Sequence, residues 1–176
     1  MNIIPVPAPG LERSAYDAIW NKIYDDFHFC PSCNACPESW ILLPGPYRKY
    51  RLNGVFTEEQ EKMVNSIFCE IHAGEMYALD WRHDCFIYNP REEISSSECF
   101  YDAERGCSVY FPSYYPDGDY HFFASFDWSL GLYGHPWKKE ILVAGENLIQ
   151  EFDKVQDILN ITGLETNCVP GREAFP

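Results

Sequence analysis

Apolar residues recur at helical spacing in three parts of the chain. The first stripe follows Ser14, a possible N-cap, and must end before Pro31; it consists of Tyr16, Ile19, Trp20, Ile23 and Phe27. The second follows the capping box TEEQ (57–60) and consists of Met63, Val64, Ile67, Phe68 and Ile71. The third starts near Glu146 and consists of Leu148, Ile149, Phe152, Val155, Ile158 and Leu159. These stripes predict three amphipathic helices.

Between the second and third helices the pattern becomes strand-like. Strands are predicted in EMYALDW (75–81), DCFIYN (84–89), CSVYFPS (107–113) and DYHFFASF (119–126). The segment 129–137 reads as a short strand or loop, and KEILVAG (139–145) reads as the last strand. The turn residues of YYPDGD (114–119) predict a hairpin that joins the two strands on either side of it.

The order of elements predicts an α+β protein: a mostly antiparallel sheet with about three helices packed on one face. No composition shift or linker divides the chain, so residues 1–176 are expected to form a single domain. Residues 1–13 read as an extended lead-in and 162–176 as an irregular tail. Residues 30–54, rich in Cys, Pro and Gly, read as irregular.

The charge balance limits the classes of partner that this chain is expected to bind. The formal net charge is −14, with 27 acidic and 13 basic residues and no basic cluster. Nucleic-acid backbones and anionic membranes repel such a chain, whereas a basic protein partner is attracted to it. The chain opens without a signal peptide pattern and contains no bilayer-spanning apolar run, which predicts a cytoplasmic protein. Its eight cysteines are then expected to be mostly reduced.

Three of these cysteines, Cys30, Cys33 and Cys36, are evenly spaced. They could supply three of the four ligands of a structural zinc site, but no second C-x2-C pair supplies the rest. A redox site would place the pair between a strand and a helix, which this segment does not. We favour loop thiols and expect no cofactor, with zinc at these three residues as the open alternative.

The candidates for catalysis are His83, His135 and Asp119. His83 lies in LDWRHDC, where strand alternation places Asp80 and Asp84 on one face and His83 on the other. A His–Asp pair could act as a general base, although a hydrogen-bonded histidine at a strand end is the simpler interpretation. No catalytic motif is complete, and an enzyme would require these three side chains to converge around a cleft.

Aromatic side chains are the candidates for binding. Gly131 and Gly134 in GLYGHPW allow close backbone approach or positive φ, so this segment could form a binding loop or a structural turn. The candidate binding residues are Tyr114, Tyr115, Trp128, Tyr133, His135 and Trp137. They could stack a planar ligand or anchor a protein interface.

Several segments resemble an uncharacterised bacterial family, domain of unknown function 2716. They are YP-x-GDY at 115–120, G-x-x-GHPW at 131–137, G-x-x-L at 145–148, YALDWRHDCFIYNP at 77–90 and the opening helix with its F-x-P-S end at 16–32. The three cysteines do not belong to this pattern. The resemblance brings no reaction with it. Some members resemble neighbours of polymorphic toxin genes, which implies an immunity role.

Three functions follow as hypotheses. The first is an acidic interaction protein, for instance an immunity-type inhibitor of a basic toxin. The second is a small-ligand protein that binds a nucleotide-like molecule on an aromatic platform. The third is an enzyme that uses His83, His135 and Asp119.

Overall fold

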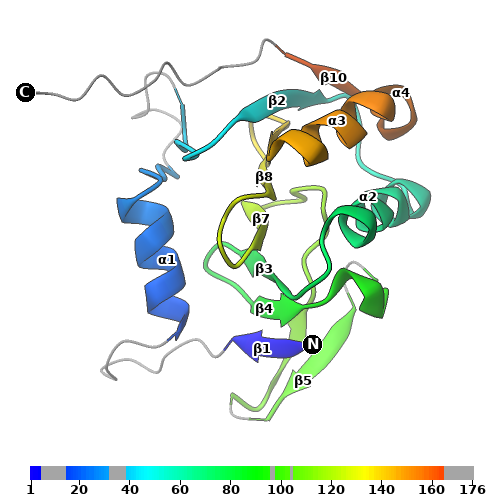
Figure 1. Ribbon diagram of the computed structural model, residues 1–176. Helices are drawn as coiled ribbons and strands as arrows, with labels where there is room; N and C mark the ends of the chain where they lie inside the picture. Colours follow the sequence, from blue (N-terminus) through cyan, green and yellow to red (C-terminus); the bar gives the residue numbers. More distant parts are fainter. Residues whose placement is uncertain (5–14, 32–38, 96–97, 104, 165–176) are drawn as a thin grey trace, which may run out of the picture.

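The computed structural model describes residues 1–4, 15–31, 39–95, 98–103 and 105–164. Its centre is an eight-stranded sheet in which every neighbouring pair is antiparallel (Figure 1). In spatial order the strands are β1 (Asn2–Ile4), β4 (Cys85–Tyr88), β3 (Met76–Asp80), β7 (His121–Ser125), β8 (Gly131–His135), β9 (Glu140–Ala144), β2 (Tyr47–Leu52) and β10 (Ile161–Gly163). A separate two-stranded sheet pairs β5 (Cys99–Asp102) with β6 (Cys107–Tyr110).

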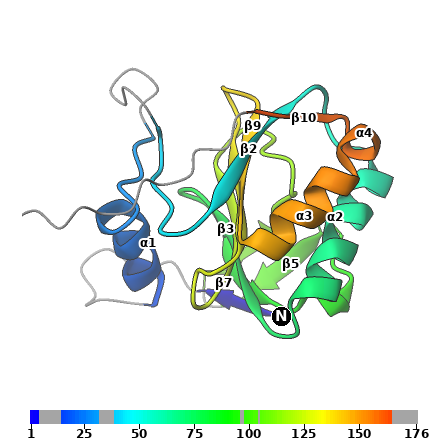
Figure 2. The same cartoon turned by 45° about the horizontal axis from the view of Figure 1, so that its top comes forward.

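Helices cover both faces of the large sheet. Helix α1 (Ala15–Asp25) lies on one face, whereas α2 (Glu58–Ile71), α3 (Glu146–Lys154) and α4 (Gln156–Leu159) lie on the other (Figure 2). A 3-10 turn, η1 (Pro90–Glu92), packs beside α2. The α+β class and the antiparallel sheet are therefore confirmed. The expected packing of all helices on one face is corrected, because α1 closes a second core.

The two cores explain the composition of the central strands. Every residue of β7, β8 and β9 is buried. Phe123 and Leu132 point into the core beneath α2 and α3, while Phe122 and Tyr133 point into the core beneath α1. A sheet covered on both sides needs apolar residues at successive positions, so the alternation typical of a half-exposed strand is lost.

The helices form where their local signals predict them, except that the third is divided at Val155 into α3 and α4, which leaves Ile158 of the predicted stripe 57% exposed. Thr57 accepts a hydrogen bond from the Gln60 amide at 3.3 Å, and the Gln60 side chain accepts one from the Thr57 amide at 2.8 Å. This reciprocal pair is the predicted capping box. The stripe of α2 is buried at Val64, Ile67 and Phe68. The proposed N-cap of α1, Ser14, lies outside the described residues.

The predicted hairpin across residues 114–119 is wrong. Strand β6 pairs with β5, and β7 lies between β3 and β8. Residues 111–120 instead run from the small sheet to the large one. The segment is held by contacts with α2 rather than by a neighbouring strand, because Glu61 accepts hydrogen bonds from the amides of Tyr114 and Tyr115.

Three strands are not predicted from the sequence: two form where irregular structure is predicted, and one forms in the lead-in, which is predicted only to be extended. Strand β2 lies in the segment 30–54, β1 in the lead-in, and β10 in the tail. The sequence of β2, YRKYRL, shows no apolar alternation, because two of its basic residues are partly buried and paired with acids. Arg48 pairs with Asp153 at 2.7 Å, and Lys49 pairs with Glu140 at 3.6 Å. Strands β1 and β10 have three residues each, too few to show a period.

Within the described ranges, none of the helices combines the length and apolar composition that a membrane crossing requires.

The glycines of β8 test the close packing of the central strands. A Cβ atom on Gly134 would lie 2.8 Å from the Cβ of Pro116, whereas a Cβ on Gly45 would meet nothing within 4 Å. We expect Gly134→Ala to lower the free energy of unfolding by about 1–3 kcal/mol, because the buried site has no room to expand. The matched Gly45→Ala should change it by less than about 0.5 kcal/mol. Urea unfolding measures both, and equal effects would contradict the close approach at β8.

Candidate functional site

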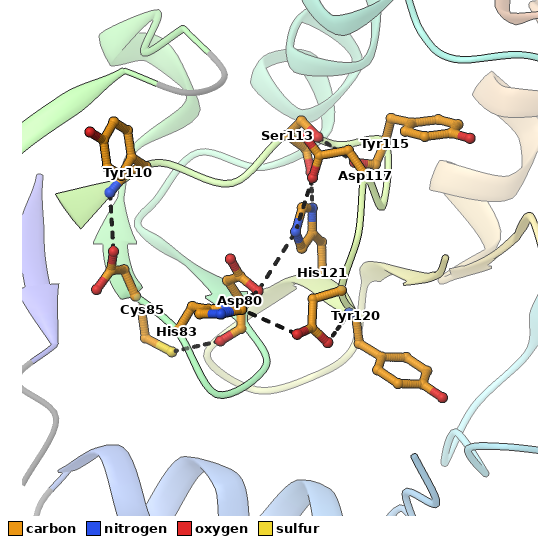
Figure 3. A network of polar contacts seen from close by, with 11 residues as sticks. Asp80, His83, Cys85, Tyr110, Ser113, Tyr115, Asp117, Tyr120 and His121 are labelled. Carbon is orange, nitrogen blue, oxygen red and sulfur yellow. Dashed lines mark hydrogen bonds and ion pairs between the residues drawn. The ribbon is translucent and has the colours of Figure 1, made fainter. Parts of the chain in front are cut away.

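A group of histidines and aspartates gathers where β3 ends and β7 begins. We call Asp80, His83, Asp117, Asp119 and His121 the His–Asp cluster. Asp80 and His121 are direct partners in the antiparallel register of β3 and β7. Figure 3 shows Asp80 between the rings of His83 and His121. The sheet register therefore brings together residues that are distant in the sequence.

A tight turn directs His83 toward Asp80. The His83 amide donates to the Asp80 carbonyl at 3.1 Å, and Arg82 has a φ of 65°. His83 Nδ1 consequently lies 3.1 Å from Asp80 Oδ1 and 3.6 Å from Asp119 Oδ2. The predicted placement of His83 on the face opposite Asp80 is wrong, because the strand stops at Asp80 and alternation does not continue through the turn.

His121 contacts the cluster from the buried side. Its side chain is 3% exposed, and Nδ1 lies 2.9 Å from the Ser113 carbonyl oxygen, so Nδ1 carries a proton and donates it. Nε2 then faces Asp80 Oδ1 at 3.7 Å and Asp117 Oδ1 at 3.5 Å. In the sequence His121 follows Tyr120 directly after the aspartate-rich turn, which was its one signal. Only the pairing of β3 with β7 shows that it lies opposite Asp80.

Two opposing effects act on the pKa values of the cluster: burial disfavours the charged form of each group, and attraction between the aspartates and histidines favours it. Burial raises the pKa of Asp80, although the neighbouring His121 and His83 act in the opposite direction. Burial acts to lower the pKa of His83, but the hydrogen bond and charge of Asp80 and the charges of Asp119 and Asp84 outweigh it, so this pKa is raised. Both shifts favour the form in which each group carries its proton.

A pocket of about 920 Å³ adjoins the cluster. It lies between α2 and the segment 111–117. Its lining includes Ser113 and Asp117, which Figure 3 shows beside the His121 ring. We call it the acidic pocket, because four carboxylates line it: Glu58, Glu61, Glu93 and Asp117. Its apolar walls include Val55, Phe56, Phe111, Tyr114 and Tyr115.

Of the three predicted catalytic residues, the structure brings two together. His83 and Asp119 are in contact, but His135 is fully buried and packs edge-on against Trp40. His135 Nδ1 accepts a hydrogen bond from the Lys138 amide at 3.2 Å, and its Nε2 lies 3.3 Å from the Tyr120 hydroxyl. Burial, helped by Lys138 and Lys49, lowers the pKa of His135 to about 4, so the ring is neutral at pH 7. It acts as a structural hydrogen-bonding group.

The predicted binding residues are divided between several places. Tyr114 and Tyr115 line the acidic pocket. Trp128 and Tyr133 are buried in the core beneath α1, on the other side of the sheet. Trp137 is 57% exposed and packs edge-on against Tyr120 at 5.3 Å between ring centroids. The structure thus does not assemble one aromatic platform from these side chains.

The proposed cysteine site is only partly described. Cys30 forms a disulfide bond, while Cys33 and Cys36 lie outside the described residues. The prediction of loop thiols, with zinc at these three residues as the alternative, is therefore not tested by the described residues. Four other cysteines are free thiols: Cys69, Cys85, Cys99 and Cys107.

Comparison with known proteins places the chain among uncharacterised relatives. It is 29% identical over 166 residues to "Uncharacterized protein YxiI" of Bacillus subtilis (strain 168), a match that covers 85% of this chain and 94% of the relative. No solved structure matches the chain. Residues 10–149 match the family model described as "Protein of unknown function (DUF2716)", and this match includes both the His–Asp cluster and the acidic pocket. The chain belongs to this family.

Proposed function

We propose that this protein binds a basic protein partner and that the acidic pocket receives a positively charged side chain of that partner. The observation that carries the proposal is the lining of the pocket by four carboxylates. The one basic residue in the lining, Lys62, is paired with Glu58 at 2.6 Å. The remaining negative charge attracts an arginine or lysine side chain.

The walls of the pocket suit such a side chain. The aliphatic stem of arginine or lysine packs against apolar surface while its charged end reaches a carboxylate. Phe56 and Tyr115 contact each other and provide this surface, and Val55 at the rim is 70% exposed. An apolar anchor beside an acidic group is typical of protein interfaces at which a basic side chain binds.

Glu61 is the pocket carboxylate that binds the backbone of the segment 111–117. Its two oxygens accept hydrogen bonds from the amides of Tyr114 at 2.8 Å and Tyr115 at 3.0 Å. The Tyr114 hydroxyl donates to Asn65 on the same helix at 2.8 Å. Burial raises the pKa of Glu61 to about 7, against the opposing effect of these two amides. The charge of the pocket therefore changes near neutral pH.

An immunity-type inhibitor of a basic toxin is the biological form of this function that we favour. The net charge of −14 supports it, because long-range attraction speeds association with a basic target. A small organic cation is a second candidate, since the pocket volume lies within the range of about 300–1,000 Å³ that small-molecule sites occupy. The carboxylates disfavour a nucleotide-like anion, so the ligand we propose is cationic in both cases.

Binding of a defined basic peptide tests the charge of the pocket. We expect a fluorescein-labelled, arginine-rich peptide of about ten residues to bind, and a glutamate-rich peptide of equal length not to bind. Asp117→Asn should weaken binding by roughly three- to tenfold, because a nearby charge pair contributes about 1 kcal/mol. Fluorescence anisotropy at low and high salt measures this.

Glu70→Gln is the matched control, because Glu70 is exposed on α2 and does not line the pocket. It removes the same net charge elsewhere. If it weakened binding as much as Asp117→Asn, the peptide would be sensing net charge and not the pocket. Binding of a small cation such as arginine amide with the same variant pattern would favour the second candidate.

The pH dependence of stability tests the burial of Glu61. Its pKa of about 7 in the folded protein lies above its value of about 4.3 in an unfolded chain. The unfolded chain therefore loses this proton first. The contribution of Glu61 to the free energy of unfolding is complete below pH 4 and falls as the pH rises toward 7, by up to roughly 3 kcal/mol.

We expect the difference in unfolding free energy between wild type and Glu61→Gln to shift by about 1–3 kcal/mol between pH 4 and pH 8, in favour of the variant at high pH. Urea unfolding at both pH values measures it, with Glu70→Gln as the control that should show no comparable shift. A constant difference between wild type and Glu61→Gln would show that Glu61 titrates as an ordinary surface carboxylate.

A further inference from the structure

Three potential metal ligands converge at the end of β3. Asp80, His83 and Asp119 each present one donor atom, and these atoms lie within 4.8 Å of one another. Two of the separations are 3.1 Å, from Asp80 Oδ1 to His83 Nδ1, and 3.6 Å, from His83 Nδ1 to Asp119 Oδ2. Donors around a tetrahedral ion with bonds of about 2.0–2.1 Å lie roughly 3.3–3.4 Å apart. Two of the three separations are therefore close to those of ligands around one ion, and the third is no longer than 4.8 Å.

The backbone holds two of these ligands in place. Asp119 Oδ1 accepts a hydrogen bond from the Tyr120 amide at 2.8 Å, which leaves Oδ2 directed at His83. The Trp81 amide donates to the Tyr120 carbonyl at 3.0 Å, so the chain segments that carry Asp80 and Asp119 are joined directly beside the cluster. Asp80 is thus fixed by strand pairing, and Asp119 by a hydrogen bond to the backbone directly before β7.

The carboxylates of the cluster have no permanent cation among the described residues. Their ion pairs there involve only His83 and His121. Other partly buried carboxylates are paired with arginine: Asp84 with Arg105 at 2.8 Å, and Asp153 with Arg48 at 2.7 Å. Carboxylates held close together without such a partner repel one another and favour a bound cation.

His121 gives an independent reason to place a positive charge here. Because its Nδ1 donates to the Ser113 carbonyl, the neutral ring presents the lone pair of Nε2 to the oxygens of Asp80 and Asp117. In the described part of the chain this nitrogen has no hydrogen-bond donor to accept from, and its side chain is only 3% exposed. Asp80 is partly buried and Asp117 is 55% exposed, so this buried lone pair faces two carboxylates at the edge of the core, and a cation beside them removes the repulsion between the acceptors.

We propose that the His–Asp cluster binds a divalent first-row metal ion through Asp80, His83 and Asp119. His121, fixed by the Ser113 carbonyl, then lies on the buried side of Asp80, and the ion offsets the repulsion between its Nε2 lone pair and the Asp80 oxygen. One imidazole nitrogen and two carboxylate oxygens suit Mn²⁺, Fe²⁺ or Zn²⁺. The side chain of His83 is 60% exposed, so the remaining positions of the ion face solvent. This site differs from the cysteine segment in both its residues and its donor atoms.

Binding of Mn²⁺ to the full chain after treatment with a chelator tests the proposal. Electron paramagnetic resonance measures the free ion, and thiols compete weakly for Mn²⁺ because it prefers oxygen and nitrogen ligands. We expect one equivalent to bind, and Zn²⁺ to displace it at the same stoichiometry. His83→Ala and Asp119→Asn should each weaken binding by at least about 10–100-fold, the range known for loss of even an outer partner.

Both variants are chosen to keep the fold. His83 is exposed, and asparagine at position 119 retains the oxygen that accepts from the Tyr120 amide. His72→Ala and Asp157→Asn are the matched controls, because they change the same residue types outside the cluster. They should leave the affinity for Mn²⁺ unchanged, and circular dichroism confirms that all four variants fold.

Two results would overturn the proposal. If neither Mn²⁺ nor Zn²⁺ bound stoichiometrically, the His–Asp cluster would not be a metal site. If an ion bound with equal affinity to wild type, His83→Ala and Asp119→Asn, it would bind elsewhere, for example at the carboxylates of the acidic pocket. Neither result would bear on the binding of basic peptides, because His83 and Asp119 do not line that pocket.

Discussion

Burial of the central strands on both faces is the constraint on which the other features depend. Strands β7, β8 and β9 consist of buried residues throughout, so neither face of the sheet can be left in water. One face is covered by α2 and α3, and the other by α1 together with residues such as Trp40 and Ile41. Polar groups at the strand ends must then find partners, which is why His135 and Glu140 are hydrogen-bonded although buried.

The same constraint locates the chemistry at the margin of the sheet. Inside β7 and β8 there is no room for solvated side chains, and a polar cluster can form only where a strand stops. Asp80 is the last residue of β3 and His121 is the first of β7, so their pairing marks the boundary between dry core and solvent. Beyond this boundary Asp117 belongs both to the cluster and to the acidic pocket. The two proposed sites are thus adjacent, but different residues would bind the metal ion and the basic side chain.

The sequence predicts those features that are encoded locally. The capping box at Thr57 and the stripe of α2 need only a few neighbouring residues, and both are found as predicted. Strand β2 could not be recognised in the same way, because its charged residues become understandable only beside Asp153 and Glu140, about a hundred residues away. Its pairing with β9 is a property of the topology, which no local period contains.

In the candidate site, too, some features follow from local sequence and others only from the topology. His83 and Asp119 were identified from their residue types, and they are in contact. The orientation of His83 was not predictable from alternation, because the left-handed conformation of Arg82 reverses the chain within the turn. His121 was not identified, since its meaning depends on facing Asp80 across two strands. Residue type indicated the chemistry, and register determined which residues take part.

The position of β2 in the sheet has a consequence for folding. Its two neighbours, β9 and β10, are both formed by residues beyond 139, so β2 has no partner until most of the chain has left the ribosome. In this part of the sheet, β2 is therefore synthesised long before either of the strands with which it pairs. Contacts so distant in sequence form slowly, because a long loop must close before they give any stability. Until then an unpaired strand with buried-type residues such as Tyr50 and Leu52 is exposed to other chains, and rapid completion of the sheet is what protects it.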